Sequence, residues 1–551
     1  MLGYDDVYRD APMTDKQAET PPSAWAPLRQ PLFRALWIAT LVSNIGTWVH
    51  EVGAGWLMVT LNPNPLMVSL VQAATALPIF LLALPGGALA DIIDRRRYLI
   101  YTQAWMLLVV LALAVTTALG WVNAWALLAF TFALACGAAL NTPAWAATVH
   151  ELVPRGELQA AIALNSLGIN LARAVGPALA GVIVAASGPQ AAFMLNAVSF
   201  IGVIVVLLRW PRAPAPSTLP AERFSSALRA GVRYVREATG LQYVMGRAAA
   251  FFVFSSATWA LLPLVARNTG GGADTYGLLL AGIGAGAVFA ALVMPLLRRR
   301  CSRDVLVRGA TVIYATGTIG VALSGTLFVL FPAVFACGMA WLALLSTLHV
   351  SAQTAVPQWV RARALSVYLM VYAAGMTGGA VLWGAMAARW GVPPALLSAS
   401  AGALIAMFIT WRLTLGGEDA LARSAPASLM RSPGHDDIPP ERGPVAVHVE
   451  YRIALDDAEA FITAAQGMER IRRRDGALSW GLFEDPDVPG RYVETFVVES
   501  WAEHLRQHHR GTADDAPLFE RVRAFHRGDG SPRVTHWIAV NPSDGTESEI
   551  V

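Results

Sequence analysis

Apolar runs of about 20 residues, the length a helix needs to cross a bilayer of roughly 30 Å, recur in this chain from Phe33 to Leu415. Of its 551 residues, 55% are hydrophobic and only 14% are charged, which is more apolar surface than a soluble protein can bury. The runs therefore predict an all-α polytopic membrane protein. We expect twelve transmembrane helices, at residues 33–60, 66–90, 98–119, 122–147, 158–186, 189–209, 243–267, 275–297, 304–323, 326–350, 362–388 and 393–413.

The gaps between these spans alternate between arginine-rich and nearly uncharged segments. Arginines gather at 95–97, 209–236 and 298–303, with further ones at Arg155 and Arg361. Arginine-rich loops of membrane proteins stay on the cytoplasmic side. We therefore expect a multi-pass protein of the cell inner membrane with both termini in the cytoplasm.

An internal repeat divides the membrane part into two halves. When the chain is shifted by 203 residues, arginines and glycines at the ends of its spans coincide. Arg95 falls on Arg298, Gly188 on Gly391 and Arg209 on Arg412. Two six-helix halves related by an axis along the membrane normal have this pattern. The sequence thus predicts a duplicated transporter architecture.

A change of composition marks a further domain at the C-terminal end. A segment rich in Ser, Pro and Gly precedes a pattern of strand, helix, strand, strand, helices and strand, which is ferredoxin-like. The expected organisation is an N-terminal tail at 1–31, the first half at 32–210, a cytoplasmic linker at 211–242, the second half at 243–415, a flexible linker at 416–443, an α+β domain at 444–541 and a tail at 542–551.

The gap between the second and third spans contains the motif Gly87-Ala-Leu-Ala-Asp91-Ile-Ile-Asp94-Arg95-Arg96-Arg97. It resembles the cytoplasmic signature of the major facilitator superfamily. That resemblance implies that Gly87 packs helices closely, that Asp91 caps the next helix and pairs across the domain interface, and that Arg95 and Arg96 brace the loop. Asp94 stands where the family usually has glycine, and the arginines alone are also explained as a topogenic charge cluster.

The fifth span contains Arg173-Ala-Val-Gly176-Pro177-Ala-Leu-Ala-Gly181. This stretch resembles the antiporter signature of drug exporters in the same superfamily. Pro177 removes a backbone hydrogen bond and kinks the helix, while Gly176 and Gly181 allow a close neighbour.

The whole membrane part resembles the branch of the superfamily that contains the enterobactin exporter and the transmembrane secretion effectors. The resemblance implies export of a small amphipathic molecule, such as a siderophore, drug or secondary metabolite, by alternating access and proton antiport. A lipid flippase of the same fold and a membrane-tethered oxygenase stay open as alternatives. The expected partners are the small-molecule substrate, protons and membrane lipid, without nucleic acid.

The C-terminal domain contains Ser479-Trp480-Gly481 and three histidines, His504, His508 and His509. It resembles the dimeric α/β-barrel family that includes antibiotic-biosynthesis monooxygenases. This implies a possible homodimer through the domain. The histidines lie in a run rich in Arg and Glu that is typical of a solvated helix face, so we expect neither a metal, a cofactor nor catalysis.

Ionisable side chains inside a membrane are costly and mark functional sites. Glu51 and His50 in the first span and Arg173 in the fifth are the main candidates for coupling. Glu51 lies about 17 residues and Arg173 about 15 residues from the cytoplasmic ends of their spans, which places them at similar depth and able to pair. The alternative is that Glu51 reaches water at the outer surface.

Several polar and aromatic residues of the first half are candidates for the wall of a substrate cavity. They are Asn44, Trp48, Asn141 and Asn170. Polar side chains also join helices to one another, and tryptophans also gather at membrane interfaces, so both alternatives stay open.

Overall fold

A computed structural model describes residues 23–211, 234–236, 238–357, 360–416, 438–508, 510–511 and 515–540. Within these ranges twelve helices are long and apolar enough to cross a membrane, which confirms the predicted architecture. They are α1 (Pro31–Leu61), α2 (Pro65–Ile92), α3 (Arg95–Ala118), α4 (Ala124–Leu152), α5 (Leu158–Ser187), α6 (Pro189–Leu208), α8 (Thr239–Asn268), α9 (Ala273–Arg300), α10 (Arg303–Leu323), α11 (Leu327–Thr354), α12 (Arg361–Trp390) and α13 (Val392–Ile409). Two 3-10 turns, Ala26–Arg29 and Arg155–Glu157, precede α1 and α5.

Short local signals set the helix ends. Asn64 caps α2 by accepting a hydrogen bond from the Leu66 amide at 2.9 Å, and Pro65 occupies the first helical position. Gly188 and Gly391 adopt φ values of 79° and 92° at equivalent junctions of the two halves. Glycine adopts this left-handed conformation without steric cost, so the repeated glycines make the same tight helix-to-helix turn twice.

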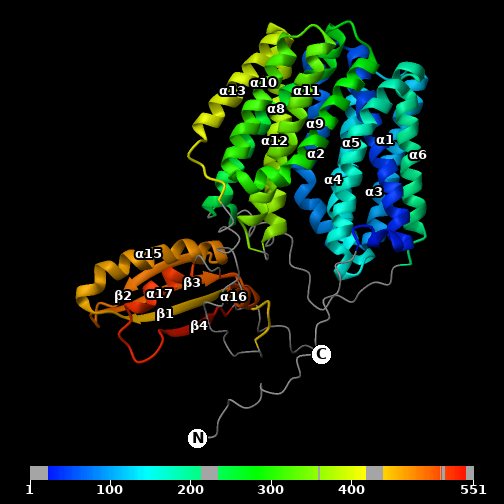
Figure 1. The fold of residues 1–551 in the computed structure, drawn as a ribbon. Helices are drawn as coiled ribbons and strands as arrows, with labels where there is room; N and C mark the ends of the chain where they lie inside the picture. The colour runs from blue at the N-terminus through cyan, green and yellow to red at the C-terminus, as the bar shows by residue number, and fades with distance from the viewer. Residues whose placement is uncertain are drawn as a thin grey trace.

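The two halves, α1 to α6 and α8 to α13, lie side by side (Figure 1). The main contacts between them join α5 to α9 and α2 to α12. Glycines make these contacts close. A Cβ added at Gly277 would lie 2.6 Å from the carbonyl oxygen of Pro177, and one added at Gly384 would lie 1.7 Å from Oγ of Ser69.

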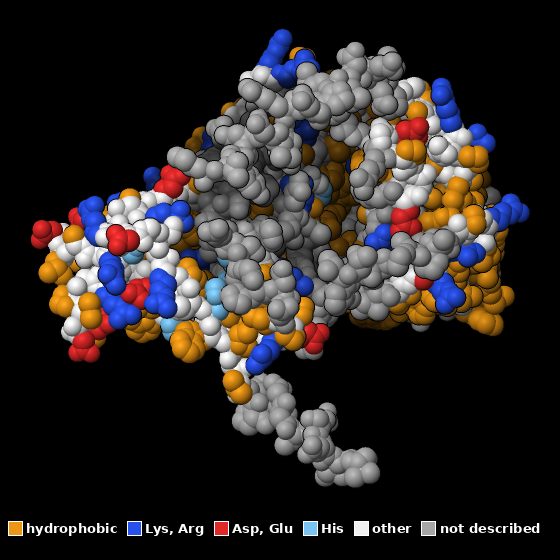
Figure 2. All heavy atoms as spheres, turned by 90° about the horizontal axis from the view of Figure 1, so that it is seen from below, with side chains coloured by type: hydrophobic (Ala, Val, Ile, Leu, Met, Phe, Trp, Pro, Cys, Tyr) orange, Lys and Arg blue, Asp and Glu red, His pale blue; other side chains and the backbone are white. Residues whose placement is uncertain are grey.

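These close contacts seal one end of the bundle. Ser69 lies near the start of α2 and Gly384 near the end of α12, at the end where α1 passes into α2. A hydrophobic core there combines residues of both halves, such as Met58 and Leu261. At the opposite end the first half has cores of its own, around Phe33 and Tyr98. Figure 2, seen from that opposite end, shows the surface hollowed between the two halves.

The α+β domain has the predicted ferredoxin-like order. Its elements are β1 (Val445–Arg452), a 3-10 turn (Leu455–Asp457), α15 (Ala458–Asp475), β2 (Ser479–Glu484), β3 (Arg491–Val498), α16 (Trp501–His508), α17 (Ala516–Ala524) and β4 (Arg533–Ile538). The strands form one antiparallel sheet in the order β2-β3-β1-β4. Burial alternates along β1 and β3, because helices cover one face of the sheet only.

A buried ion pair lies between α15 and the sheet. Arg472 Nε donates to Glu494 Oε1 at 2.8 Å, and Trp480 and Tyr451 donate to the same carboxylate at 3.0 and 3.1 Å. Burial acts to raise the pKa of Glu494, but Arg472 and these hydrogen bonds hold it below its ordinary value. The side chains fill the interior of the domain between helix and sheet.

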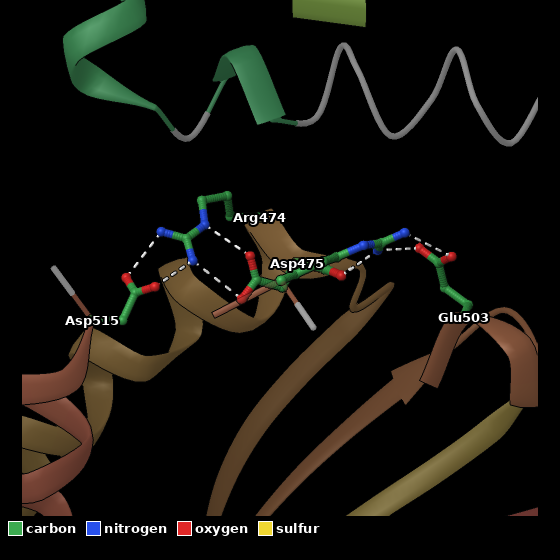
Figure 3. Close-up of polar contacts among 5 residues, drawn as sticks. Arg474, Asp475, Glu503 and Asp515 are labelled. Carbon is green, nitrogen blue, oxygen red and sulfur yellow. Dashed lines mark hydrogen bonds and ion pairs between the residues drawn. The ribbon is translucent and has the colours of Figure 1, made fainter. Parts of the chain in front are cut away.

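A second charged network joins α15, α16 and the start of α17 (Figure 3). Arg474 binds both Asp475, at 2.8 and 3.1 Å, and Asp515, at 2.9 and 2.7 Å. Arg510 donates to the Asp475 carbonyl oxygen at 2.5 Å and to Glu503 at 2.5 and 3.0 Å. Burial raises the pKa of the Asp475 carboxyl to about 6, against the effect of Arg474. The network fixes how the helices meet.

The histidines of α16 do not lie on a solvated face, which corrects the sequence interpretation. His504 and His508 are 1% and 8% exposed, and their Nε2 atoms lie 3.3 Å apart. His504 also contacts His536 of β4, with ring centroids 4.6 Å apart. The inward face of α16 repeats at helical spacing through Trp501, His504 and His508, which the charged residues between them obscure. Among the described residues no group of three His, Cys, Asp or Glu side chains is arranged to hold a metal, and His509 lies outside them.

Candidate functional site

A cavity of about 400 Å³ lies between the two halves. Its wall comes from α1, α2, α4 and α5 of the first half and from α8, α9, α11 and α12 of the second. Helices at equivalent positions of the repeat thus build both sides. Beyond the cavity, the close α5–α9 and α2–α12 contacts seal one end of the bundle.

The first half supplies the polar wall. Two neighbouring residues of α1, His50 and Glu51, line the cavity together with Arg173 of α5. Glu51 is exposed, and the surface it exposes faces the cavity. Further polar side chains of this wall are Thr47, Gln72, Thr75, Thr131 and Thr142.

The structure brings Glu51 and Arg173 to the same cavity but not into direct contact. No ion pair joins these two described residues within 4.0 Å. Their charges are nevertheless within electrostatic reach of each other. Arg173 lies instead over the ring of Trp48, with its Cζ atom 5.9 Å from the ring centroid. This cation–π contact holds the guanidinium on the first-half side of the cavity.

His50 is more enclosed than Glu51. Its side chain is 3% exposed and packs against Phe193 of α6, with ring centroids 4.9 Å apart. Neither ring nitrogen has a hydrogen-bond partner within the described part of the chain. His50 therefore stands as a buried titratable group next to the carboxylate.

The second half supplies an aromatic wall. Trp259, Trp341 and Tyr372 line it together with Tyr276 and Met376. The rings of Trp259 and Trp341 meet at 5.2 Å between centroids. Behind them, Phe252 contacts both Trp341, at 5.6 Å, and Tyr372, at 4.7 Å. Rings packed this closely form a rigid apolar surface.

Of the four predicted cavity residues, only Trp48 lines this cavity. Asn141 Oδ1 accepts hydrogen bonds from Thr102 at 3.0 Å and Gln103 at 3.4 Å, so it joins α4 to α3. Asn170 donates to the Ser166 carbonyl oxygen of its own helix at 2.8 Å. Asn44, like these two, is absent from the cavity wall. Asn141 therefore joins two helices to each other, which is the alternative role expected of polar side chains in a membrane span.

The helix-five signature lies where three helices meet. A Cβ at Gly176 would lie 2.5 Å from Cβ of Trp48 in α1, and one at Gly181 would lie 3.1 Å from the Ala273 carbonyl oxygen in α9. The Pro177 carbonyl faces Gly277, also of α9. The motif therefore packs α5 against its own half and against the other half at once.

The loop signature braces the first half. Arg95 Nη1 lies 2.6 Å from Glu151 Oε1 of α4, and Arg96 donates to the Leu207 and Leu208 carbonyl oxygens at the end of α6. The N-cap of α3 is Asp94, which accepts from the Arg97 amide at 3.0 Å. The side chain of Asp91 lies outside the described residues. A Cβ at Gly87 would meet no atom of the described residues within 4 Å.

Two tyrosines beside Glu51 escaped the sequence interpretation. Tyr276 and Tyr372 come from the second half and line the same cavity as Glu51. Tyrosine in a span is commonly an interfacial anchor, so no pattern in the sequence distinguishes these two.

Two pseudo-symmetric helical halves around a central cavity define a secondary transporter of the major facilitator type. The profile of the transmembrane secretion effector family matches residues 22–544, and the chain belongs to that family.

Named relatives agree with this class. The chain is 26% identical over 406 residues to the enterobactin exporter EntS of Salmonella typhimurium, covering 72% of this chain and 95% of the relative. It is 23% identical over 330 residues to the staphyloferrin A transporter of Staphylococcus aureus, covering 59% and 82%. Among solved structures, a bacterial homologue of the lysosomal transporter Spinster shares the fold with a TM-score of 0.54 at 16% identity, covering 70% of this chain and 94% of that one. The protein is a multi-pass inner-membrane transporter of small molecules.

Proposed function

We propose that this protein exports a small amphipathic molecule by alternating access, driven by protons that enter through Glu51. The observation that carries the proposal is the placement of one carboxylate and one guanidinium in a cavity between two halves that is closed at one end. The relative named as an enterobactin exporter supports the direction of transport.

In the proposed cycle, two contacts between the halves open and close. They are the contact of α5 with α9 and that of α2 with α12, which we call the seams. In the described state the seam of α5 with α9 and of α2 with α12 is closed, and the cavity opens toward the end where α1 begins. If that end is cytoplasmic, as the arginine distribution predicts, this is the inward-facing state. Rocking of the halves opens the seam and closes the other end.

Proton binding supplies two electrostatic states. With Glu51 ionised, its charge balances that of Arg173 within the cavity. A proton on Glu51 leaves the guanidinium uncompensated, which is costly inside a membrane protein. The two states favour different conformations, and a carrier that couples protons to transport needs such a difference.

The shape of the cavity supports an amphipathic substrate. One wall offers hydroxyl, amide and charged groups, and the other offers Trp259, Trp341 and Tyr372. A ligand with one polar edge and one flat apolar face satisfies both walls.

Removal of the charge pair tests the coupling unit. Arg173→Ala leaves Glu51 without its compensating charge, so we expect transport to fall to background. Adding Glu51→Ala removes the unbalanced charge and should restore the yield of folded protein in the membrane, while uphill export stays absent. The measurements are detergent-extracted yield by gel filtration and export in vesicles. A double variant that is as unstable as Arg173→Ala alone would contradict the pairing.

The orientation is a separate prediction. A reporter fused after Leu415, or within 214–222, which lies outside the described residues, should score as cytoplasmic. A reporter inserted at Gly271, between α8 and α9, should score as external. Alkaline phosphatase and green fluorescent protein fusions measure this. A cytoplasmic score at Gly271 would overturn the assignment of the sides.

Deletion of 444–551 should leave substantial transport. Both signature motifs, the seams and the cavity lie in the membrane part, and the α+β domain has a core of its own. Export by the truncated and full chains in the same vesicles, at matched protein level, measures this. Complete loss in a stably inserted truncation would show that the domain belongs to the transport unit.

Pairing of two chains through the α+β domain stays part of the proposal. The sheet face away from α15 carries two large exposed side chains, Phe483 at 60% and Trp537 at 63%. Light scattering of the full and truncated chains would distinguish a dimer that depends on this domain from a monomer.

A further inference from the structure

The two walls of the cavity differ in charge because the repeat did not duplicate its ionisable residues. Under the shift of 203 residues, Arg173 corresponds to Met376, which also lines the cavity, and Glu51 corresponds to Phe254. No Lys, Arg, His, Asp or Glu of the described second half lines the cavity. The charge of the cavity is therefore set by the first half.

The described titratable residues that line the cavity with Glu51 are Arg173 from α5, Tyr276 from α9, Tyr372 from α12 and His50 of the same helix, whose ring packs against Phe193. With Glu51 ionised, the charges of Glu51 and Arg173 sum to zero. With Glu51 protonated, the cavity carries the positive charge of Arg173.

We infer that the substrate is an organic cation with an apolar, ring-containing body, which displaces the proton at Glu51. The inference rests on the proposed proton antiport and adds the charge of the substrate. A cation and a proton exclude each other here, because the protonated cavity is already positive. An anion would bind best to the protonated cavity, so it would travel with the proton, and export would then have to move protons outward.

The aromatic wall fits the same ligand. The faces of Trp and Tyr rings carry partial negative charge and attract cations within about 6 Å of the ring centroid. Trp259, Trp341 and Tyr372 present a joined surface, with 5.2 Å between the first two centroids and 6.5 Å between the last two. Tyr372 and Glu51 line the same cavity, so a ligand in it meets both the ring and the carboxylate.

Two probes of equal shape and opposite charge test the inference. Tetraphenylphosphonium and tetraphenylborate differ in charge alone to a good approximation. Their binding to the full chain in nanodiscs is measured by equilibrium dialysis against empty discs at pH 5 and at pH 8, which gives four affinities. We expect the cation to bind more weakly as the pH falls, by up to about tenfold per pH unit once Glu51 is protonated. Glu51→Gln should bind the cation weakly at every pH.

Each outcome decides between distinct claims. If tetraphenylborate binds specifically and more tightly on acidification, with the dependence lost in Glu51→Gln, the substrate is anionic and our inference is overturned, while Glu51 remains the proton site. If the affinity of wild type for both ions is independent of pH, Glu51 does not couple protons and the proposed function itself fails. The wild-type comparison alone gives these answers even if Glu51→Gln does not fold.

Discussion

Glu51→Gln is expected to abolish export against a gradient while leaving downhill exchange. The amide cannot release a proton, so the cavity keeps one electrostatic state throughout the cycle. For each proton exchanged, a gradient of one pH unit supports an accumulation of about tenfold, since 1.4 kcal/mol corresponds to a factor of ten. The variant should lose this factor and reach equal concentrations on both sides. Accumulation and counterflow in everted vesicles measure the two activities.

Asp274→Asn is the matched control for Glu51→Gln. Asp274 is an exposed carboxylate in the first turn of α9 and does not line the cavity. Its replacement should leave uphill export unchanged. If Glu51→Gln exports against a gradient as well as Asp274→Asn, then Glu51 is only a solvated residue and the coupling proposal is wrong.

Gly277→Val should prevent the seam between α5 and α9 from closing. Its Cβ would lie 2.6 Å from the Pro177 carbonyl oxygen and 2.7 Å from Cα of Gly181, and these backbone atoms cannot turn away. Overpacking of this kind costs about 1–3 kcal/mol, which shifts a two-state equilibrium by about fivefold to more than a hundredfold. We expect transport to fall at least about fivefold and the cavity to become accessible from the outside. Labelling of Gln72→Cys by an impermeant maleimide on intact cells measures the accessibility.

Gly378→Val provides the comparison for Gly277→Val. Gly378 lies in α12, and a Cβ added there would meet no atom within 4 Å. This variant bears the same loss of glycine and the same branched side chain without touching the seam. Unchanged labelling in Gly277→Val, relative to Gly378→Val, would show that the seam is not the contact that opens.

The arrangement along the chain could be predicted because it depends on local signals. Span lengths and the paired glycines Gly188 and Gly391 act within a few residues, and the structure reproduces them. Buried residues alternate with less buried ones along β1 and β3 in the same way, because helices cover only one face of the sheet.

Contacts between distant helices could not be predicted in this way. Depth counting placed Glu51 and Arg173 at one level, but the position of Arg173 over Trp48 depends on how α1 and α5 face each other. Tyr276 of α9 reaches α1 where Gly55 leaves room for it, since a Cβ added at Gly55 would lie 3.0 Å from the tyrosine hydroxyl. The buried His504 was missed because charged residues such as Glu503 and Arg506 stand next to it in the sequence, although the His504 side chain lies on the inward face of α16.

Proton-driven export can be measured most directly in everted vesicles with an imposed proton gradient, acidic inside. A panel of ring-containing amphipathic cations, acids and neutral compounds would be offered to the outer face, which is the cytoplasmic face of the protein. We predict that at least one compound accumulates inside vesicles with the wild-type chain, and that a protonophore or Glu51→Gln reduces its level to that of the medium. Accumulation that persists after the proton gradient has been collapsed would contradict the account.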